Sequence, residues 1–310
     1  MQHPSYIKLH SSGELIERIR QLYSLMKECK LCPRKCLAKR FEGNYGVCRS
    51  TNQLLVSSLS AHYGEESPLV GWNGSGTIFF TNCNLWCLYC QNYDISHLRH
   101  GEVITINQLA EAMLSLQQLG CHNINFVTPT HFIPQIIDAV GIAVDKGLNI
   151  PLVYNCGGYE SVETLKLLDG IIDIYMPDIK YSINQNSYKY SGAKDYWDVV
   201  QPAIIEMHRQ IGDLKMNPFG IAERGLLIRH LILPNDITGS KKVLDFIVNK
   251  VCVDSYVNIM DQYRPAFKAY RYPELSRNIT LDEYYEVINY AESIGLHRGF
   301  GKYEKLLEVH

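Results

Sequence analysis

The sequence has no long apolar run and no excess of charge of either sign. No stretch approaches the roughly 18 apolar residues that a membrane-spanning helix needs. Residues 1–20 also lack the apolar core of a secretory signal. The formal net charge of -2 provides no general attraction to nucleic acid or to a membrane surface. We therefore expect a cytoplasmic protein with neither a membrane nor a nucleic acid among its partners.

Cysteine is plentiful, with ten residues in the chain. Disulfides are rare in a reducing compartment, so clustered cysteines are better candidates for metal ligands. The clusters are Cys29, Cys32, Cys36 and Cys48 near the N-terminus, and Cys83, Cys87 and Cys90 further along. The isolated cysteines are Cys121, Cys156 and Cys252. The sequence therefore predicts two metal sites.

The chain after residue 75 alternates two kinds of pattern. β-branched and aromatic runs typical of buried strands occupy 76–81, 123–128, 150–155, 171–176, 226–234 and 256–260. Helical patterns occupy 105–120, 132–147, 162–170, 195–212, 240–250 and 280–295. Because strand-helix-strand crossovers are right-handed, this alternation predicts a parallel sheet. Six units are fewer than the eight of a closed barrel, so we expect an α/β fold with an open, partial (β/α)6 barrel.

Four segments follow from these patterns. We expect a cysteine-rich metal-binding segment at 1–55, a connecting strand and loop at 56–75, the barrel at 76–265 and a helical segment completing it at 266–310. The first 50 residues hold ten Lys or Arg against four Glu, so this part is locally basic.

Three cysteines after the first predicted strand suggest an open metal site. An iron-sulfur cube is usually held by four thiolates, so three leave one iron open to another ligand. An open coordination position is the mark of a catalytic metal. A zinc knuckle without its fourth ligand, or three buried thiols, are the alternative interpretations. Active sites of such barrels form where strands end, and this loop lies there.

The spacing C-x3-C-x2-C, with Tyr89 before the last cysteine, resembles the signature of radical S-adenosylmethionine (SAM) enzymes. Nearly the whole chain resembles the uncharacterised branch of the pyruvate formate-lyase activating enzyme family, the PflX-type iron-sulfur proteins. The segments that carry this resemblance are "CKLCPRKC", "GSGTIFFTNCNLWCLYCQN", "HNINFVTPTH", "VYNCGGY", "YMPDIKY" and "RHLILP". The resemblance implies a radical SAM barrel with a [4Fe-4S] cluster on Cys83, Cys87 and Cys90. Reductive cleavage of SAM would give a 5'-deoxyadenosyl radical that takes a hydrogen atom from the substrate.

The resemblance also implies which residues contact SAM. Tyr89 and Gln91 would flank the adenine. Asp178 and Lys180 match an Asp-x-Lys that contacts SAM after the fourth strand. His230, beside Arg229, matches the place where a fifth-strand residue reaches the cofactor.

One departure from the family concerns the second strand. The family usually carries Gly-Gly-Glu there to hold the SAM amino group, whereas this chain has Thr128, Pro129, Thr130 and His131. Hydroxyls and carbonyls at Thr128 and Thr130 would then accept the ammonium hydrogen bonds. His131 would orient substrate or be a satisfied structural histidine.

The resemblance implies partners as well. Better-known members of the family make a glycyl radical on a partner enzyme, and a reductant such as flavodoxin or ferredoxin would supply the electron. Many activases insert a ferredoxin-like pair of clusters between the first two strand units, but this chain carries its extra cysteines at the N-terminus. Two other functions stay open: a radical SAM enzyme acting on another small molecule or macromolecule, and a non-catalytic iron-sulfur or zinc protein.

The N-terminal cysteines, spaced C-x2-C-x3-C-x11-C, form a full set of four ligands. They suit a closed structural zinc site or an auxiliary iron-sulfur cluster, with Arg34, Lys35 and Arg40 offsetting the negative charge. Cys156 would be a hydrogen donor, a ligand or a packed thiol, whereas Cys121 and Cys252 are expected to be structural. The tyrosines of 181–197 would form a lid or part of a solvated loop.

Overall fold

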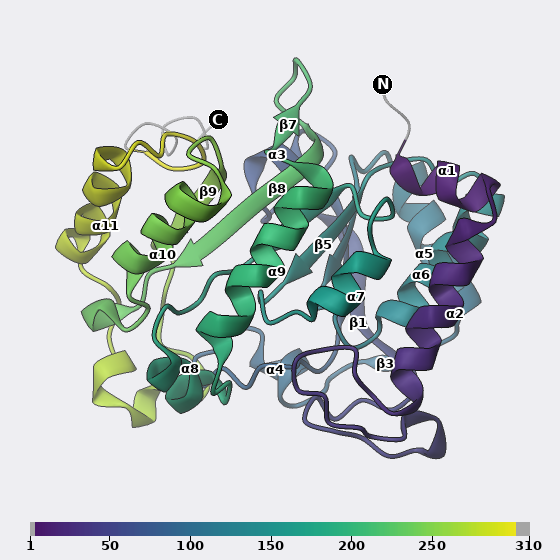
Figure 1. Ribbon diagram of the computed structural model, residues 1–310, viewed down its shortest axis with the longest axis horizontal. Coiled ribbons are helices and arrows are strands. Elements are labelled where there is room, and N and C mark those ends of the chain that lie inside the picture. Colours follow the sequence, from purple (N-terminus) through teal and green to yellow (C-terminus); the bar gives the residue numbers. More distant parts are fainter. Residues whose placement is uncertain (1–3, 302–310) are drawn as a thin grey trace.

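The computed structural model describes residues 4–301, with a nine-stranded sheet at its centre (Figure 1). Neighbouring strands follow the order β3-β1-β2-β4-β5-β6-β8-β7, and β9 also pairs with β8. The strands are β1 (Leu54–His62), β2 (Ser75–Phe80), β3 (Glu102–Ile104), β4 (Ile124–Val127), β5 (Leu152–Cys156), β6 (Ile174–Pro177), β7 (Lys215–Met216), β8 (Ala222–Leu231) and β9 (Tyr256–Met260).

Six of these strands, β2, β4, β5, β6, β8 and β9, run parallel to one another. Their register aligns the strand ends: Phe79 lies opposite Val127, which lies opposite Asn155. Within residues 4–301, β9 pairs with β8 alone, so the sheet does not close. The predicted α/β fold with an open, partial barrel of six strand units is therefore confirmed.

Helices connect the parallel strands and cover the outside of the sheet (Figure 1). They are α1 (Ser5–Ser11), α2 (Glu14–Lys27), α3 (Ser67–Val70), α4 (Tyr93–Ser96), α5 (Ile106–Gln118), α6 (Ile133–Asp145), α7 (Val162–Leu167), α8 (Asn184–Ser191), α9 (Tyr196–Ile211), α10 (Ser240–Phe246) and α11 (Leu281–Ser293). A π-helical turn, Ile247–Val251, continues α10. None of the helices in the described residues is long and apolar enough to cross a membrane.

Local sequence explains where these elements begin and end. All four residues of β4 are buried, as expected for a parallel strand covered on both faces. Thr105 starts α5 by accepting a hydrogen bond from the Gln108 N–H, and the Gln108 side chain accepts one from the Thr105 N–H. Thr280 and Glu283 start α11 in the same way. The predicted bounds of these two helices therefore lie within two residues of the observed ones.

The sequence pattern predicts the antiparallel strands less completely than the parallel strands. β1 lies in the segment predicted to hold a connecting strand, and it pairs with both β2 and β3. The sequence pattern does not predict β3 or β7, because they contain only three and two residues, most of them exposed. Strands this short carry no measurable alternation.

Residues 181–197, predicted to form a lid or a solvated loop, instead contain the helix α8. Tyr181, Tyr190 and Tyr196 belong to the hydrophobic core, whereas Tyr188 is exposed. The interpretation as a solvated loop is wrong, because the apolar face of this polar-looking segment consists mainly of tyrosine rings. A sequence pattern based on aliphatic residues does not detect a buried face made of tyrosine rings.

The short helix α3 closes the amino-terminal end of the barrel. Leu69 of α3 is fully buried and shares an inner cluster with Val153, Ile174 and Leu227 from three of the parallel strands. The residues just before α3 therefore lie in the barrel interior, close to the candidate site.

Gly158 allows the loop after β5 to lie directly against the end of β6. Its φ is +75°, and a Cβ would lie 2.2 Å from the carbonyl oxygen of Asp178. Gly158→Ala should lower the free energy of unfolding by about 2 to 5 kcal/mol, since a positive φ and a backbone overlap both cost energy. Anaerobic urea denaturation followed by circular dichroism measures this loss.

Gly147→Ala is the matched control for this prediction. Gly147 also has a positive φ, +97°, but a Cβ there would meet nothing within 4 Å. Its expected loss is therefore about 1 to 2 kcal/mol, from the backbone conformation alone. Equal losses for the two variants would contradict the close approach.

Candidate active site

Cys83, Cys87 and Cys90 line one cavity of about 200 Å³ at the carboxyl-terminal ends of the parallel strands. The loop after β2 supplies the cysteines, and residues at the ends of the other strands supply the facing walls. These wall residues include Thr128, Asn155, Cys156, Asp178, Lys180 and Arg229. Figure 1 shows this end of the barrel at its lower edge, where α4 and α8 lie. The cysteines therefore lie where active sites of such barrels form.

A hydrogen-bonding group lies next to each of these three sulfurs. The pairs are Leu85 N with Cys83 Sγ at 3.4 Å, Ser191 Oγ with Cys87 Sγ at 3.1 Å, and Ser96 Oγ with Cys90 Sγ at 3.2 Å. Hydrogen bonds to sulfur orient and stabilise the thiolate ligands of iron-sulfur clusters. All three thiols are free. Three free sulfurs on one cavity, each with such a neighbour, fit a [4Fe-4S] cluster.

Tyr89 and Gln91 do not line this cavity. Tyr89 is buried behind the loop, where its hydroxyl accepts a hydrogen bond from the Tyr181 hydroxyl at 2.7 Å. Its ring also packs edge-on against Tyr263, with ring centroids 6.0 Å apart. Gln91 is exposed and donates to the carbonyl of Gln262. The structure therefore brings neither residue together with the cysteines, although both flank their loop.

Asp178 and Lys180 do lie at the cavity, as the sequence predicts. The Lys180 ammonium donates to Asp178 at 2.5 Å, and Arg229 Nε donates to the same carboxylate at 2.8 Å. Although burial opposes it, the positive charges of Arg229 and Lys180 lower the pKa of Asp178. A buried but ionised carboxylate therefore faces the three sulfurs.

On β8, Arg229 reaches the cavity and His230 does not. Successive side chains of a strand point to opposite faces, so only one of the two can enter the barrel. His230 is fully buried on the helix side, with its ring nitrogens 2.7 Å from the Ile179 carbonyl and 2.9 Å from Ser240 Oγ. The residue predicted to reach the cofactor is thus turned away, and its neighbour occupies the expected place.

The two threonines after β4 differ in the same way. Thr128 lines the cavity with a φ of +59°, and its N–H donates to the Asn155 carbonyl. The Thr130 hydroxyl is buried and donates to Glu160 at 2.7 Å. Glu160 also accepts from the hydroxyl of Tyr154, and burial raises the pKa of this carboxyl to about 7. Thr128 can therefore contact a ligand, whereas Thr130 holds a buried acid.

His131 and Cys156 are both buried. His131 Nε2 lies 2.7 Å from the Thr81 carbonyl, and burial lowers the pKa of His131 to about 3. This histidine is therefore neutral and anchors the loop that leads to the cysteines. Cys156 lines the cavity, where burial raises the pKa of its thiol and keeps it protonated.

Two glutamates that the sequence analysis did not single out also reach the barrel interior. Glu65 and Glu66 precede α3, and their side chains lie 3.9 and 3.5 Å from Arg229. Asn155 Nδ2 lies 3.5 Å from Glu65, and Asn258 Nδ2 lies 3.3 Å from Glu66. They occur before the first parallel strand, in a segment without an active-site motif, so only the fold reveals their position.

The polar interior is incompletely paired. In the described part of the chain, Glu66 Oε2 is buried and has no hydrogen-bond partner. Buried polar atoms are normally bonded, so an orphaned carboxylate oxygen marks a place for a ligand or water. Glu65 lines the same cavity as the three cysteines, which connects this polar floor to them.

The N-terminal cysteine segment lies directly on the three-cysteine loop. Arg34 Nε donates to the Asn84 carbonyl at 3.0 Å, and the indole N–H of Trp86 donates to the Val47 carbonyl at 3.0 Å. The Arg49 guanidinium lies 4.4 Å from the centre of the Trp86 ring. The two cysteine clusters therefore belong to neighbouring parts of one surface.

No three of the four N-terminal sulfurs all lie within 4.8 Å of one another in the described chain, although Cys29 and Cys36 are in hydrogen-bonding contact. Within residues 4–301, the one group of three His, Cys, Asp or Glu ligand atoms that all lie within 4.8 Å of one another is His208, Asp213 and Cys252. In a tetrahedral zinc site with Zn–S bonds of about 2.3 Å, the sulfurs lie about 3.8 Å apart. An iron-sulfur cluster tolerates wider spacing, because each cysteine binds a different iron.

A buried arginine accompanies these cysteines. Arg40 is 1% exposed, forms no ion pair with a carboxylate in the described chain, and lies 4.0 Å from Cys29 Sγ. It donates to the carbonyls of His131 and Thr51. A buried cation without an acidic partner fits four cysteines that carry negative charge as metal thiolates.

The sequence has relatives among curated proteins, although no family model matches it. The uncharacterized protein MJ0674 of Methanocaldococcus jannaschii is 33% identical over 282 residues, which cover 88% of this chain and 77% of MJ0674. The chain belongs to the MJ0674 family. The uncharacterized protein MJ0808 of the same organism is 24% identical over 304 residues, covering 89% of this chain and 84% of MJ0808.

Among solved structures, Streptococcus suis SuiB bound to the precursor peptide SuiA aligns with this MJ0674-family chain at a TM-score of 0.49 and 11% identity. The alignment covers 71% of this chain and 46% of SuiB, so the chain spans less than half of that protein's length.

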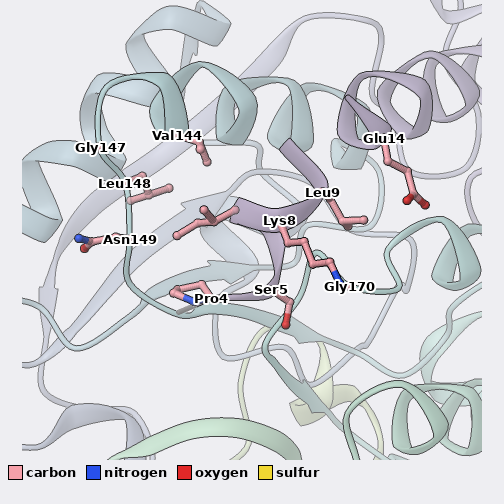
Figure 2. A pocket seen from close by; sticks show the side chains of 11 residues that line it. Pro4, Ser5, Lys8, Leu9, Glu14, Val144, Gly147, Leu148, Asn149 and Gly170 are labelled. Atoms are coloured by element: carbon pink, nitrogen blue, oxygen red, sulfur yellow. The ribbon is translucent and has the colours of Figure 1, made fainter. Parts of the chain in front are cut away.

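This member of the MJ0674 family also has a larger, shallower pocket, of about 790 Å³, beneath α1 (Figure 2). Its walls come from α1, the end of α6 and Gly170, at the amino-terminal side of the strands. Lys8 and Glu14 are its charged residues, and no cysteine lines it. It lies away from the strand ends and lacks a converging set of reactive groups, so it is not the candidate active site.

Glu65 generates a prediction about pH. Burial and the adjacent Glu66 carboxylate raise the pKa of Glu65 from 4.5 to about 7, despite the charge of Arg229. The folded chain therefore holds a proton that the unfolded chain releases between about pH 4.5 and 7, and stability falls as pH rises through that range. Glu65→Gln should lack this dependence, gaining on the order of 1 to 3 kcal/mol over wild type between pH 5 and pH 8.

Anaerobic urea denaturation at the two pH values measures this gain. Glu163→Gln, an exposed position on α7, is the matched control and should show no pH-dependent difference from wild type. A Glu65→Gln variant whose stability tracks wild type at both pH values would contradict the burial of a protonatable group at this position.

Proposed function

We propose that this chain is a radical SAM iron-sulfur enzyme in which Cys83, Cys87 and Cys90 hold a [4Fe-4S] cluster. The observation that carries the proposal is the convergence of three hydrogen-bonded sulfurs and the ionised Asp178 on one cavity. Three thiolates leave one coordination position for a ligand. When bound, the cluster and SAM would together supply a 5'-deoxyadenosyl radical for hydrogen abstraction from a substrate.

The chain's own residues would bind and orient SAM beside the cysteines. The Asp178 carboxylate, held by Lys180 and Arg229, accepts hydrogen bonds from hydroxyl or ammonium groups. Thr128 lines the same cavity, and its hydroxyl and carbonyl are further acceptors. The buried walls exclude water, which strengthens each of these polar contacts.

The floor of the cavity would face the substrate. Glu65 and Glu66 present carboxylate oxygens around Arg229. Asn258 Nδ2 donates to Glu66 Oε1, and Glu66 Oε2 has no partner among the described residues. A substrate group with several hydrogen-bond donors would satisfy these acceptors. Glu65, protonated at neutral pH in part of the molecules, can also donate one hydrogen bond.

A finer proposal concerns the substrate and the reductant. The resemblance to activating enzymes implies a glycyl-radical enzyme as the partner and flavodoxin or ferredoxin as the electron donor. This proposal rests on sequence resemblance alone. A purified glycyl-radical enzyme that gains its radical only in the presence of this chain and SAM would support it.

We also propose that Cys29, Cys32, Cys36 and Cys48 hold an auxiliary iron-sulfur cluster in preference to zinc. The separation of the sulfurs, no three of which lie within 4.8 Å of one another in the described chain, supports this choice, whereas the buried Arg40 would offset the charge of either metal site. The contact of this segment with the loop that carries Cys83 supports a role close to the catalytic cysteines.

Cys87→Ala tests the catalytic cluster. Anaerobically reconstituted wild-type protein should show a reduced-cluster electron paramagnetic resonance spectrum that changes when SAM is added, together with formation of 5'-deoxyadenosine. Cys87→Ala should lose the change on adding SAM and the formation of 5'-deoxyadenosine, because two thiolates cannot hold the site-differentiated cluster, while any signal of the auxiliary cluster remains. Cys121→Ala, which removes a buried thiol away from the cavity, should retain both. Production of 5'-deoxyadenosine by Cys87→Ala would refute the ligand assignment.

Cys32→Ser tests the auxiliary cluster. Iron content should fall from about eight to about four atoms per chain, since a [4Fe-4S] cluster holds four. Proteolysis before residue 55 should become faster, because the metal supplies folding energy to that segment. A variant that keeps its iron but loses one zinc would instead support a structural zinc site.

A further inference from the structure

A second group of metal-ligating side chains meets at the opposite end of the barrel from the cavity. His208 Nε2, Asp213 and Cys252 Sγ all lie within 4.8 Å of one another, with His208 and Asp213 3.0 Å apart. We propose that these three side chains bind one divalent transition metal, zinc, with water at the fourth position. This reassigns Cys252, which the sequence analysis expects to be only structural.

The chemistry of the three ligands favours zinc. Zinc binds cysteine sulfur at about 2.3 Å, and histidine nitrogen and carboxylate oxygen at about 2.0 to 2.2 Å. Tetrahedral geometry then requires ligand atoms about 3.3 to 3.8 Å apart. The 3.0 Å separation of His208 and Asp213 would lengthen slightly, and separations to Cys252 of up to 4.8 Å would shorten. Magnesium and calcium prefer oxygen ligands and would not select a cysteine and a histidine.

The local backbone brings two of the ligands together. The last turn of α9 ends with Gly212, whose φ is +69° and whose N–H donates to the His208 carbonyl at 2.7 Å. This turn reverses the chain, so that Asp213 returns to the side chain of His208. A residue with a Cβ would adopt this conformation at a cost, which explains a glycine here.

The third ligand follows an uncommon element. The π-helical turn Ile247–Val251 ends at Cys252, whose N–H donates to the Ile247 carbonyl at 3.0 Å. Such turns frequently occur at functional sites. The N–H of Asp254 lies 3.4 Å from Cys252 Sγ, and a backbone N–H at this distance stabilises a thiolate ligand.

The accessibility of the group suits an ion and a water ligand. The side chains of His208 and Asp213 are 25% and 32% exposed, so an ion can enter without opening the core. An ordinary His–Asp ion pair would need no sulfur beside it. Three metal-ligating side chains of different type meet here, and they come from the end of α9, the next loop and the residue after the π-helical turn. They therefore indicate a metal site and not an ion pair alone.

The position of the group defines what the metal would stabilise. Asp213 precedes β8, and Cys252 precedes β9, the last parallel strand of the open barrel. One ion would join these two strand entrances. Because β9 is held by one neighbouring strand in the described chain, this bond would reinforce the free edge of the sheet.

Zinc content of the anaerobically reconstituted, iron-loaded full chain tests the proposal. The protein is incubated with zinc, desalted and analysed for zinc and iron. Wild type should retain one zinc that Cys252→Ser and His208→Gln both lose, at unchanged iron content. Added zinc should raise the unfolding temperature of wild type and of the control Cys121→Ser, but not of the two site variants.

Several outcomes would overturn the proposal. One is a wild-type protein that holds no zinc after desalting, and another is a pair of site variants that hold as much zinc as wild type. Zinc that is lost in Cys32→Ser but kept in Cys252→Ser would belong to the N-terminal cysteines. If Cys252→Ser fails to fold, His208→Gln gives the same measurement without changing a thiol. Neither variant touches the catalytic cavity, so failure here leaves the proposed radical SAM function untouched.

Discussion

The guanidinium of Arg229 links the two ends of the barrel. It donates to Asp178, which faces the three cysteines at the open end, and it lies near Glu65 and Glu66, which enter from the closed end. Buried charges persist only where they are paired. The ionised state of Asp178, the position of the loop before α3 and the polar floor of the cavity therefore depend on one side chain. Arg229 points inward because of its place in the alternation of side chains along β8.

The sequence was sufficient to predict the six parallel strands and their order along the chain. Buried parallel strands are continuous apolar runs, and the helices between them have apolar residues at helical spacing, so local signals agree with the fold. The cysteines were found from their spacing and their place after the first predicted strand, whereas Asp178 came from the family resemblance. Helix α8 was missed because its buried residues are Ser187, Tyr190 and Ser191, so that neither its buried face nor its exposed face shows a run of aliphatic side chains.

Other parts of the site depend on tertiary contacts that no local pattern carries. Whether Arg229 or His230 enters the barrel depends on a single-residue phase of β8, which a motif does not specify. Glu65 reaches Arg229, and Ser191 reaches Cys87, across more than 100 residues. Such contacts exist only once the sheet has formed. The predicted roles of Tyr89 and Gln91 came from resemblance, and their side chains lie behind and outside the cavity wall.

The entry of Glu65 and Glu66 through the closed end has a consequence for how this family can diversify. These side chains belong to a connection that precedes every parallel strand, so they are structurally independent of the loop that carries Cys83, Cys87 and Cys90. Substitutions in that connection can change the charge and shape of the cavity floor while the sulfur ligands keep their positions. One rim of three sulfurs can thereby be combined with different cavity floors within the same fold.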